Sequence, residues 1–123
     1  MPTFQFVLFY VADPLASGRF YSRLFDRSLK EESATFAMLE LGANVLLGLW
    51  LRPTVEPAVD PAARPGGSEI AFVVADAAAL QATFETWVAQ GVRIAQPITE
   101  MDFGRTFVGL DPDGHRLRVF LRR

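Results

Sequence analysis

The sequence predicts an α+β fold made of two copies of one small module. The triplet Val11-Ala12-Asp13 recurs as Val74-Ala75-Asp76, and at the same offset Tyr21 corresponds to Phe84. Each triplet ends a stretch of β-type residues and begins a helical pattern, which alternating apolar stretches then follow. Because such a repeat marks a repeated supersecondary unit, each half should form one strand, one helix and then two or three antiparallel strands.

Each predicted helix begins at an aspartate. Asp13 is followed by Pro14, which gives an N-cap with proline at the first helical position, and Asp76 is the equivalent cap in the second half. Helical spacing predicts helices over residues 14–25 and 77–90, with Gly91 ending the second. The side chains expected to be buried are Phe20, Tyr21 and Leu24 in the first helix, and Leu80, Phe84 and Trp87 or Val88 in the second.

Alternating apolar residues predict the strands. Two tight turns separate neighbouring strands, Gly42-Ala43-Asn44 in the first half and Asp111-Pro112-Asp113-Gly114 in the second. In the second turn the proline fixes φ and the glycine accepts a positive φ. The expected strands cover residues 4–11, 29–32, 35–41 and 44–51 in the first half, and 69–74, 93–98, 105–110 and 115–121 in the second.

The chain of 123 residues fits a single domain. Prolines at positions 53, 57, 61 and 65 predict a linker over residues 53–66, because proline is excluded from helix interiors and central strands. The two modules then cover residues 1–52 and 67–123. Neither module is large enough to bury its sheet alone. We therefore expect the modules to pair around a cavity in a homodimer, either within one chain or by strand exchange between two chains.

Composition excludes several classes of function. Half of the residues are hydrophobic and 21% are charged, which provides a core and argues against a disordered chain. The net charge of −2 argues against a nucleic-acid partner. The absence of cysteine and the single histidine, His115, exclude thiolate zinc sites, a cysteine nucleophile and histidine clusters. With no apolar run of the roughly 20 residues that a membrane helix needs, and no signal-peptide pattern, we expect a cytoplasmic protein with no membrane partner.

Several motifs occur in a fixed order along essentially the whole chain. They are Val11-Ala12-Asp13 with Phe20-Tyr21, then Glu69–Asp76, then Phe103–Phe107 leading into Asp111–His115. In this order, and with the repeat, the chain resembles the vicinal-oxygen-chelate superfamily of glyoxalases, bleomycin-resistance proteins and extradiol dioxygenases. The resemblance implies two βαβββ modules whose half-barrel sheets surround a cavity.

The second half is similar to one branch of this superfamily. Ser68-Glu69-Ile70, Phe103–Phe107, Asp111–His115 and Arg118-Val119 resemble the phenazine-antibiotic resistance proteins, and Gly48-Leu49-Trp50 also fits that branch. Those proteins bind a planar tricyclic drug at a dimer cavity without catalysis. Because a fold alone does not determine a function, the function depends on the residues of the site.

The metal-dependent members of the superfamily place ligands on the first and last strands of each half. The resemblance puts those positions at Phe6, Gly48, Glu69 and Arg118. Only Glu69 has a side chain that binds metals, so we expect no metal and no other cofactor. Arg118 should pair with Glu69 in place of an ion, either as architecture alone or with donors left for an acidic ligand. His115 has no serine or acid fixed beside it by sequence, so no catalytic residue is predicted.

Strand alternation assigns the side chains that face the expected cavity. Gly48 should leave room beside the Trp50 indole, whose flat face suits stacking on an aromatic ligand. Phe103 and Phe107 are close in sequence to this wall. The predicted ligand-binding residues are Phe6, Gly48, Trp50, Glu69, Phe103, Phe107, Arg118 and Phe120.

This wall predicts an antibiotic-resistance-type binding protein that sequesters a planar aromatic, phenazine-like small molecule without turnover. Two alternatives stay open. One is a glyoxalase-like or dioxygenase-like enzyme of the same superfamily with an altered site. The other is a member adapted to protein interaction, in which side chains of the protein itself would fill the cavity.

Overall fold

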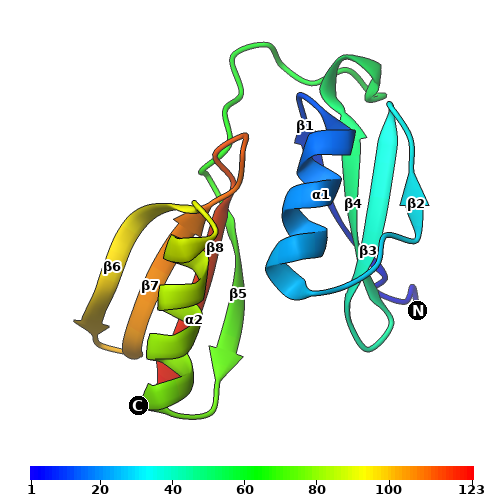
Figure 1. Ribbon diagram of the computed structural model, residues 1–123. Helices are drawn as coiled ribbons and strands as arrows, with labels where there is room; N and C mark the ends of the chain where they lie inside the picture. Colours follow the sequence, from blue (N-terminus) through cyan, green and yellow to red (C-terminus); the bar gives the residue numbers. More distant parts are fainter. The chain divides into compact units, whose positions relative to one another are not determined.

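The computed structural model describes residues 1–123 as two compact units, Met1–Ala63 and Arg64–Arg123. In the first unit a four-stranded sheet carries one helix on one of its faces (Figure 1). The strand order is β1-β4-β3-β2, with β1 parallel to β4 and the other neighbours antiparallel. The elements are β1 (Phe6–Val11), α1 (Pro14–Phe25), β2 (Glu31–Glu32), β3 (Phe36–Gly42) and β4 (Val45–Leu51).

The second unit repeats this arrangement. Its strand order is β5-β8-β7-β6, again with the first and last strands parallel and the other neighbours antiparallel. The predicted α+β fold of two βαβββ modules is therefore confirmed. The elements are β5 (Glu69–Val74), α2 (Ala77–Ala89), β6 (Arg93–Met101), β7 (Gly104–Leu110) and β8 (Arg116–Arg122).

Both aspartate caps form as predicted. The Asp13 carboxylate accepts hydrogen bonds from the backbone amides of Leu15 at 3.1 Å and Ala16 at 3.2 Å, which satisfies two of the donors left free at a helix start. The Asp76 carboxylate accepts one such bond, from the Ala79 amide at 2.8 Å. Helix α1 has the predicted bounds, and α2 ends one residue earlier than expected, before Gly91 with its φ of 82°.

The helix faces that pack on the sheets differ in part from the prediction. In α1, Tyr21 is fully buried as expected, but Phe20 and Leu24 are only half-buried. Ser17 and Gly18 take their place, because a Cβ at Gly18 would lie 3.3 Å from the Ala37 Cβ, so the helix backbone approaches β3 closely there. In α2, Trp87 is buried, whereas Val88 is exposed, which settles the alternative that the sequence left open.

The predicted proline-rich linker is structured in its first part. It begins with a short 3-10 helix, Arg52–Thr54, and Val55 is almost fully buried. The Arg52 guanidinium donates hydrogen bonds to the backbone carbonyls of Asp60 at 3.3 Å and Ala63 at 2.7 Å. These contacts fold the segment back on itself next to the first module. No helix in the structure has both the length and the apolar character needed to span a membrane.

Candidate functional site

Each sheet has one face against its helix and one open face. In the second module, β8 turns Leu117 and Val119 toward the helix, where both are buried. The alternate residues lie on the other side, which we call the second open face, and the strand register adds their neighbours from β5, β6 and β7. The second open face carries Glu69, Ala71, Val73, Gln96, Thr106, Val108, Arg116, Arg118 and Phe120.

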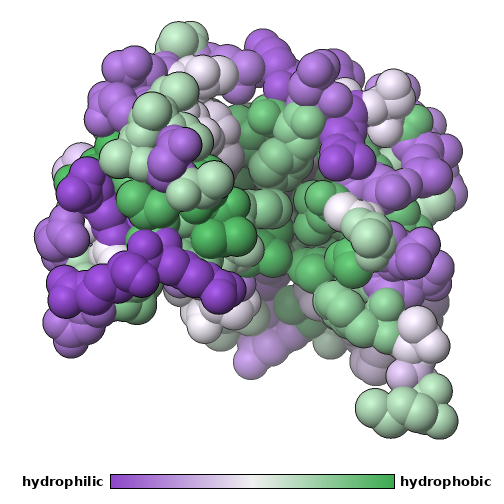
Figure 2. All heavy atoms as spheres, turned by 90° about the horizontal axis from the view of Figure 1, so that it is seen from below, coloured by the Kyte–Doolittle hydropathy of each residue, from purple (hydrophilic) through white to green (hydrophobic).

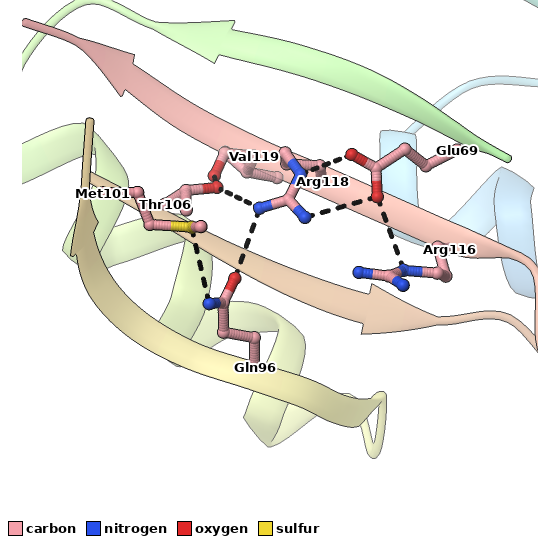
Figure 3. Close-up of polar contacts among 7 residues, drawn as sticks. All are labelled: Glu69, Gln96, Met101, Thr106, Arg116, Arg118 and Val119. Atoms are coloured by element: carbon pink, nitrogen blue, oxygen red, sulfur yellow. Dashed lines mark hydrogen bonds and ion pairs between the residues drawn. The ribbon is translucent and has the colours of Figure 1, made fainter. Parts of the chain in front are cut away.

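Arg118 and Glu69 form the centre of this face (Figure 3). Arg118 Nε donates to Glu69 Oε1 at 2.5 Å, and Nη2 donates to Oε2 at 3.3 Å. The Arg118 side chain is 13% exposed and the Glu69 side chain 31% exposed. The predicted ion pair is therefore confirmed, and it has the two-point geometry that matches a guanidinium to a carboxylate.

The remaining guanidinium nitrogen of Arg118 binds neutral side chains. Nη1 donates to Gln96 Oε1 and to Thr106 Oγ1, each at 3.2 Å. Arginine has five N–H donors, and four of them are used: one on Nε, two on Nη1 and one on Nη2. Of the donors that the sequence left for an acidic ligand, one remains, because the protein itself occupies the other four.

The neutral partners of Arg118 are themselves held in place. The Thr106 hydroxyl is fully buried and donates to the Val119 carbonyl at 2.9 Å, which leaves its oxygen lone pairs directed at the guanidinium. The Gln96 amide nitrogen contacts the Met101 sulfur at 3.6 Å, which orients its oxygen toward Arg118. Arg118 is thus fixed from three strands, β5, β6 and β7.

Arg116 is a second cation beside the same carboxylate. Its Nε lies 3.4 Å from Glu69 Oε2, within ion-pair distance but without a hydrogen bond at that nitrogen. The Arg116 side chain is 40% exposed, about three times the exposed fraction of Arg118. Two guanidiniums therefore share one carboxylate, and this cluster of three charged groups has a net charge of +1. Strand alternation predicts Arg116 on the same face as Arg118 and Phe120, as the structure shows, but Arg116 is not among the predicted ligand-binding residues.

Two phenylalanines lie next to this cluster. Phe103 and Phe120 meet edge to face, with ring centroids 6.0 Å apart, and Arg118 Cζ lies 5.8 Å from the Phe103 centroid. Phe103 is exposed and Phe120 half-buried, so both rings present surface to solvent. A guanidinium near an aromatic face adds a favourable electrostatic contact. Phe120 lies on the predicted face of β8, and Phe103, whose facing the sequence does not determine, lies beside Arg118.

Phe107 has a different place from the one predicted. It is fully buried against α2, with its ring centroid 5.2 Å from those of Phe84 and Trp87. The reason is register, because Phe107 lies opposite Val119, which points to the helix. Phe107 is therefore part of the core rather than of a ligand-binding wall.

The open face of the first module, which we call the first open face, is mostly apolar. Tyr10 and Trp50 lie opposite each other on β1 and β4, with ring centroids 6.1 Å apart and an interplanar angle of 82°. Tyr10 is exposed and Trp50 half-buried. The first open face carries Phe6, Leu8, Tyr10, Phe36, Met38, Glu40, Leu46, Gly48 and Trp50.

Gly48 does not leave the expected free space. A Cβ built at Gly48 would lie 2.6 Å from Leu8 Cδ2 and 2.8 Å from Phe36 Cζ. These two side chains come from the neighbouring strands β1 and β3 and cover the glycine, which is buried. Glycine inside a strand often marks such a close approach. The prediction of an open slot at Gly48 is therefore wrong, and Trp50 is the aromatic surface that remains accessible beside it.

The residues at the metal-ligand positions do not fit a divalent cation. Phe6 and Gly48 have no donor atom, Arg118 is a cation, and both oxygens of Glu69 contact guanidiniums. No three histidine, cysteine, aspartate or glutamate side chains lie close enough together to hold a metal ion. The Glu69–Arg118 pair thus takes up the only carboxylate of these four positions.

Comparison with known proteins identifies the family of this fold. The family model of the glyoxalase/bleomycin resistance protein/dioxygenase superfamily matches residues 3–119. The chain belongs to this superfamily. The resemblance seen in the motifs is therefore confirmed along nearly the full length of the chain.

Individual members of the superfamily are similar over the whole chain. The phenazine antibiotic resistance protein EhpR of Enterobacter agglomerans is 28% identical over 123 residues, covering 96% of this chain and 89% of EhpR. The solution structure of ATC0852 from Agrobacterium tumefaciens is 41% identical, with a TM-score of 0.88 over 100% of this chain and 99% of that one. A glyoxalase-related enzyme from Fulvimarina pelagi shares the fold, with 22% identity and a TM-score of 0.85 over 99% and 89% of the two chains.

Proposed function

We propose that this superfamily member binds a planar aromatic small molecule and releases it unchanged. The observation that carries the proposal is the state of Glu69, whose two oxygens both contact arginines while the Phe103 ring lies beside Arg118 and meets Phe120. A carboxylate held in ion pairs with two arginines is stabilised in its charged form as a structural partner, which favours a binding role over a role as general base. What the face offers instead is cationic and aromatic surface, which suits binding.

Trp50 and Tyr10 are neighbouring aromatic residues on the first open face. The indole offers a wide flat face, and stacking of aromatic rings contributes about 0.5–1.5 kcal/mol beyond the burial of apolar area. Phe103 and Phe120 offer smaller rings in the second module. A planar polycyclic compound matches such surfaces better than a flexible aliphatic one, because it loses little conformational entropy on binding.

The similarity to EhpR supports the same class of ligand. EhpR is a phenazine antibiotic resistance protein, and it is 28% identical to this chain over 123 residues. Phenazines are flat, fused aromatic molecules, which is the geometry that a stacking surface selects. We therefore take phenazine-like compounds as the first ligands to test.

A protein-interaction role is the second candidate. It is favoured by Leu8 and Phe36, which fill the position at Gly48 with side chains of the protein itself. Apolar side chains also reach the surface among charged ones (Figure 2), and Leu8, Val73 and Phe103 are exposed. A protein of this kind would bind none of the planar compounds.

We also propose that the protein acts as a homodimer. Exposed apolar side chains on the two open faces, Leu8, Tyr10 and Val73, support this, because exposed apolar surface is typical of interaction sites. Light scattering coupled to size-exclusion chromatography at micromolar concentration should give the mass of two chains. A mass of one chain, 13.6 kDa, would contradict it.

Tryptophan fluorescence tests the proposed ligand class. The chain has two tryptophans, of which Trp87 is buried in the second module and Trp50 is partly accessible. In a Trp87→Phe variant the emission comes from Trp50 alone, and titration with phenazine should quench it saturably. The compound should be recovered unchanged by chromatography after prolonged incubation. Saturable binding with chemical conversion would favour an enzyme, and no binding of any planar compound would favour the interaction role.

A further inference from the structure

The two arginines beside Glu69 differ in how far the protein uses them. Arg118 uses four of its five N–H donors in hydrogen bonds to Glu69, Gln96 and Thr106, and its side chain is 13% exposed. Arg116 makes one ion-pair contact at 3.4 Å, no hydrogen bond at Nε, and is 40% exposed. Figure 3 shows the contrast: contacts join Arg118 to Glu69, Gln96 and Thr106, whereas one contact joins Arg116 to Glu69. The two side chains therefore have different roles.

The strand register explains this difference. Glu69 lies directly opposite Arg116 in the parallel β5–β8 ladder, yet its oxygens bond to Arg118, which lies opposite Ala71. Gln96 and Thr106 hold Arg118 from the other side, so the carboxylate is drawn toward Arg118. Arg116 therefore contacts only the outer side of a carboxylate that already accepts two hydrogen bonds from Arg118. Its two terminal nitrogens make no hydrogen bond within the protein.

We propose that Arg116 binds the anionic substituent of the ligand, and that Arg118 is a positioning residue that holds Glu69. This inference rests on the proposed function and names the class of compound within it: a planar aromatic carboxylate. The terminal nitrogens of a guanidinium match the two oxygens of a carboxylate. The cluster of Glu69, Arg116 and Arg118 carries a charge of +1, which one ligand carboxylate would neutralise. Phe120 lies on the same face of β8, so a ring that extends along the strand from Arg116 past Arg118 would approach it.

A pair of matched ligands separates this inference from the proposed function. Phenazine-1-carboxylate and the neutral phenazine-1-carboxamide differ by one charge on the same ring system. In calorimetric titrations the Arg116→Met variant should lose about tenfold or more in affinity for the acid, because charge-assisted hydrogen bonds are the strong ones. Its affinity for the amide should stay within about twofold of the unmodified protein. Methionine keeps much of the apolar stem of arginine, so the change removes chiefly the charge and the donors.

The control variant is Arg105→Met. Arg105 is an exposed arginine of β7 that pairs with Glu100, so its replacement changes the net charge equally without touching the cluster. This variant should bind both compounds like the unmodified protein. The assignment of Arg116 is overturned if both variants lose the same affinity for the acid, or if Arg116→Met loses no affinity for the acid. In either case, binding of the amide by the unmodified protein still supports the proposed function. If neither compound binds the unmodified protein, the proposed function and this inference both fail.

Discussion

Arg118 and Glu69 bond diagonally across β5 and β8. The Nε–Oε1 distance is 2.5 Å and the Nη2–Oε2 distance is 3.3 Å, although the residue directly opposite Glu69 is Arg116. Glu69 bonds to Arg118 rather than to Arg116 because Gln96 and Thr106 hold the Arg118 guanidinium in place. No such hydrogen bonds hold Arg116. The pair is therefore one part of a four-residue network that joins all four strands of the second module.

Removing Arg118 should destabilise the second module. In the Arg118→Met variant Glu69 loses its two best hydrogen bonds, and the buried Thr106 hydroxyl and Gln96 lose a donor. Because Glu69 is partly exposed and regains some water, we expect a loss of about 1–3 kcal/mol in the free energy of unfolding. Urea denaturation followed by circular dichroism measures it.

The exposed pair of Arg105 and Glu100 provides a control for the same measurement. Its Nε–Oε2 distance is 3.0 Å, but the two side chains are 47% and 61% exposed. Arg105→Met should therefore cost less than about 1 kcal/mol. Equal losses in the two variants would show that the network around Arg118 adds nothing beyond a surface ion pair.

Filling the position at Gly48 should reduce stability. A leucine there would collide with Leu8 and Phe36, whose nearest atoms lie 2.6 Å and 2.8 Å from an added Cβ. We expect Gly48→Leu to cost about 1–3 kcal/mol through overpacking. The matched control is Gly42, where an added Cβ meets nothing within 4 Å, so Gly42→Ala should leave the urea midpoint nearly unchanged. A Gly48→Leu protein as stable as the unmodified one would mean that Leu8 and Phe36 move aside at little cost.

Local signals in the sequence predicted the elements well, whereas contacts between strands were predicted only in part. The start of α1 follows from Asp13 and Pro14, which act within one turn of chain. The place of Phe107 depends instead on its partner across the β7–β8 hairpin, and its alternation with Val119 decides the face. Where the register is unknown, the same residue fits either side of the sheet.

The network around Arg118 shows the same limit. The pairing with Glu69 could be predicted because the two positions come from strands that the superfamily resemblance already brings together. Gln96 could not, since the register of β6 against β7 shifts on both sides of it. Such a shift changes which residues share a face and leaves no clear mark in the sequence. The number of Arg118 N–H donors that are bound within the protein therefore could not be predicted from the sequence.

The two aspartate caps should contribute unequally to stability. Asp13 accepts two backbone hydrogen bonds and Asp76 one. Replacing an N-cap aspartate with alanine costs about 0.5–2 kcal/mol, and we expect Asp13→Ala to lie nearer the upper end than Asp76→Ala. Asparagine keeps the accepting oxygen, so Asp13→Asn should retain most of the stability in thermal denaturation. A larger loss for Asp76→Ala would contradict this order.

Trp50 should carry much of the attraction for a planar ligand. It is the largest aromatic side chain on the first open face, and Leu8 and Phe36 fill the neighbouring position at Gly48, so a ligand has no slot there. Trp50→Ala removes both stacking and apolar contact, which should weaken binding of phenazine by about 1–3 kcal/mol. Trp50→Phe keeps an aromatic ring and should lose less. Calorimetry is the suitable measurement, because these variants remove the accessible fluorophore. Phe4, an exposed aromatic residue that precedes β1, provides the control, and Phe4→Ala should bind like the unmodified protein. If Trp50→Ala binds phenazine as tightly as the unmodified protein does, the ligand does not stack on the first open face.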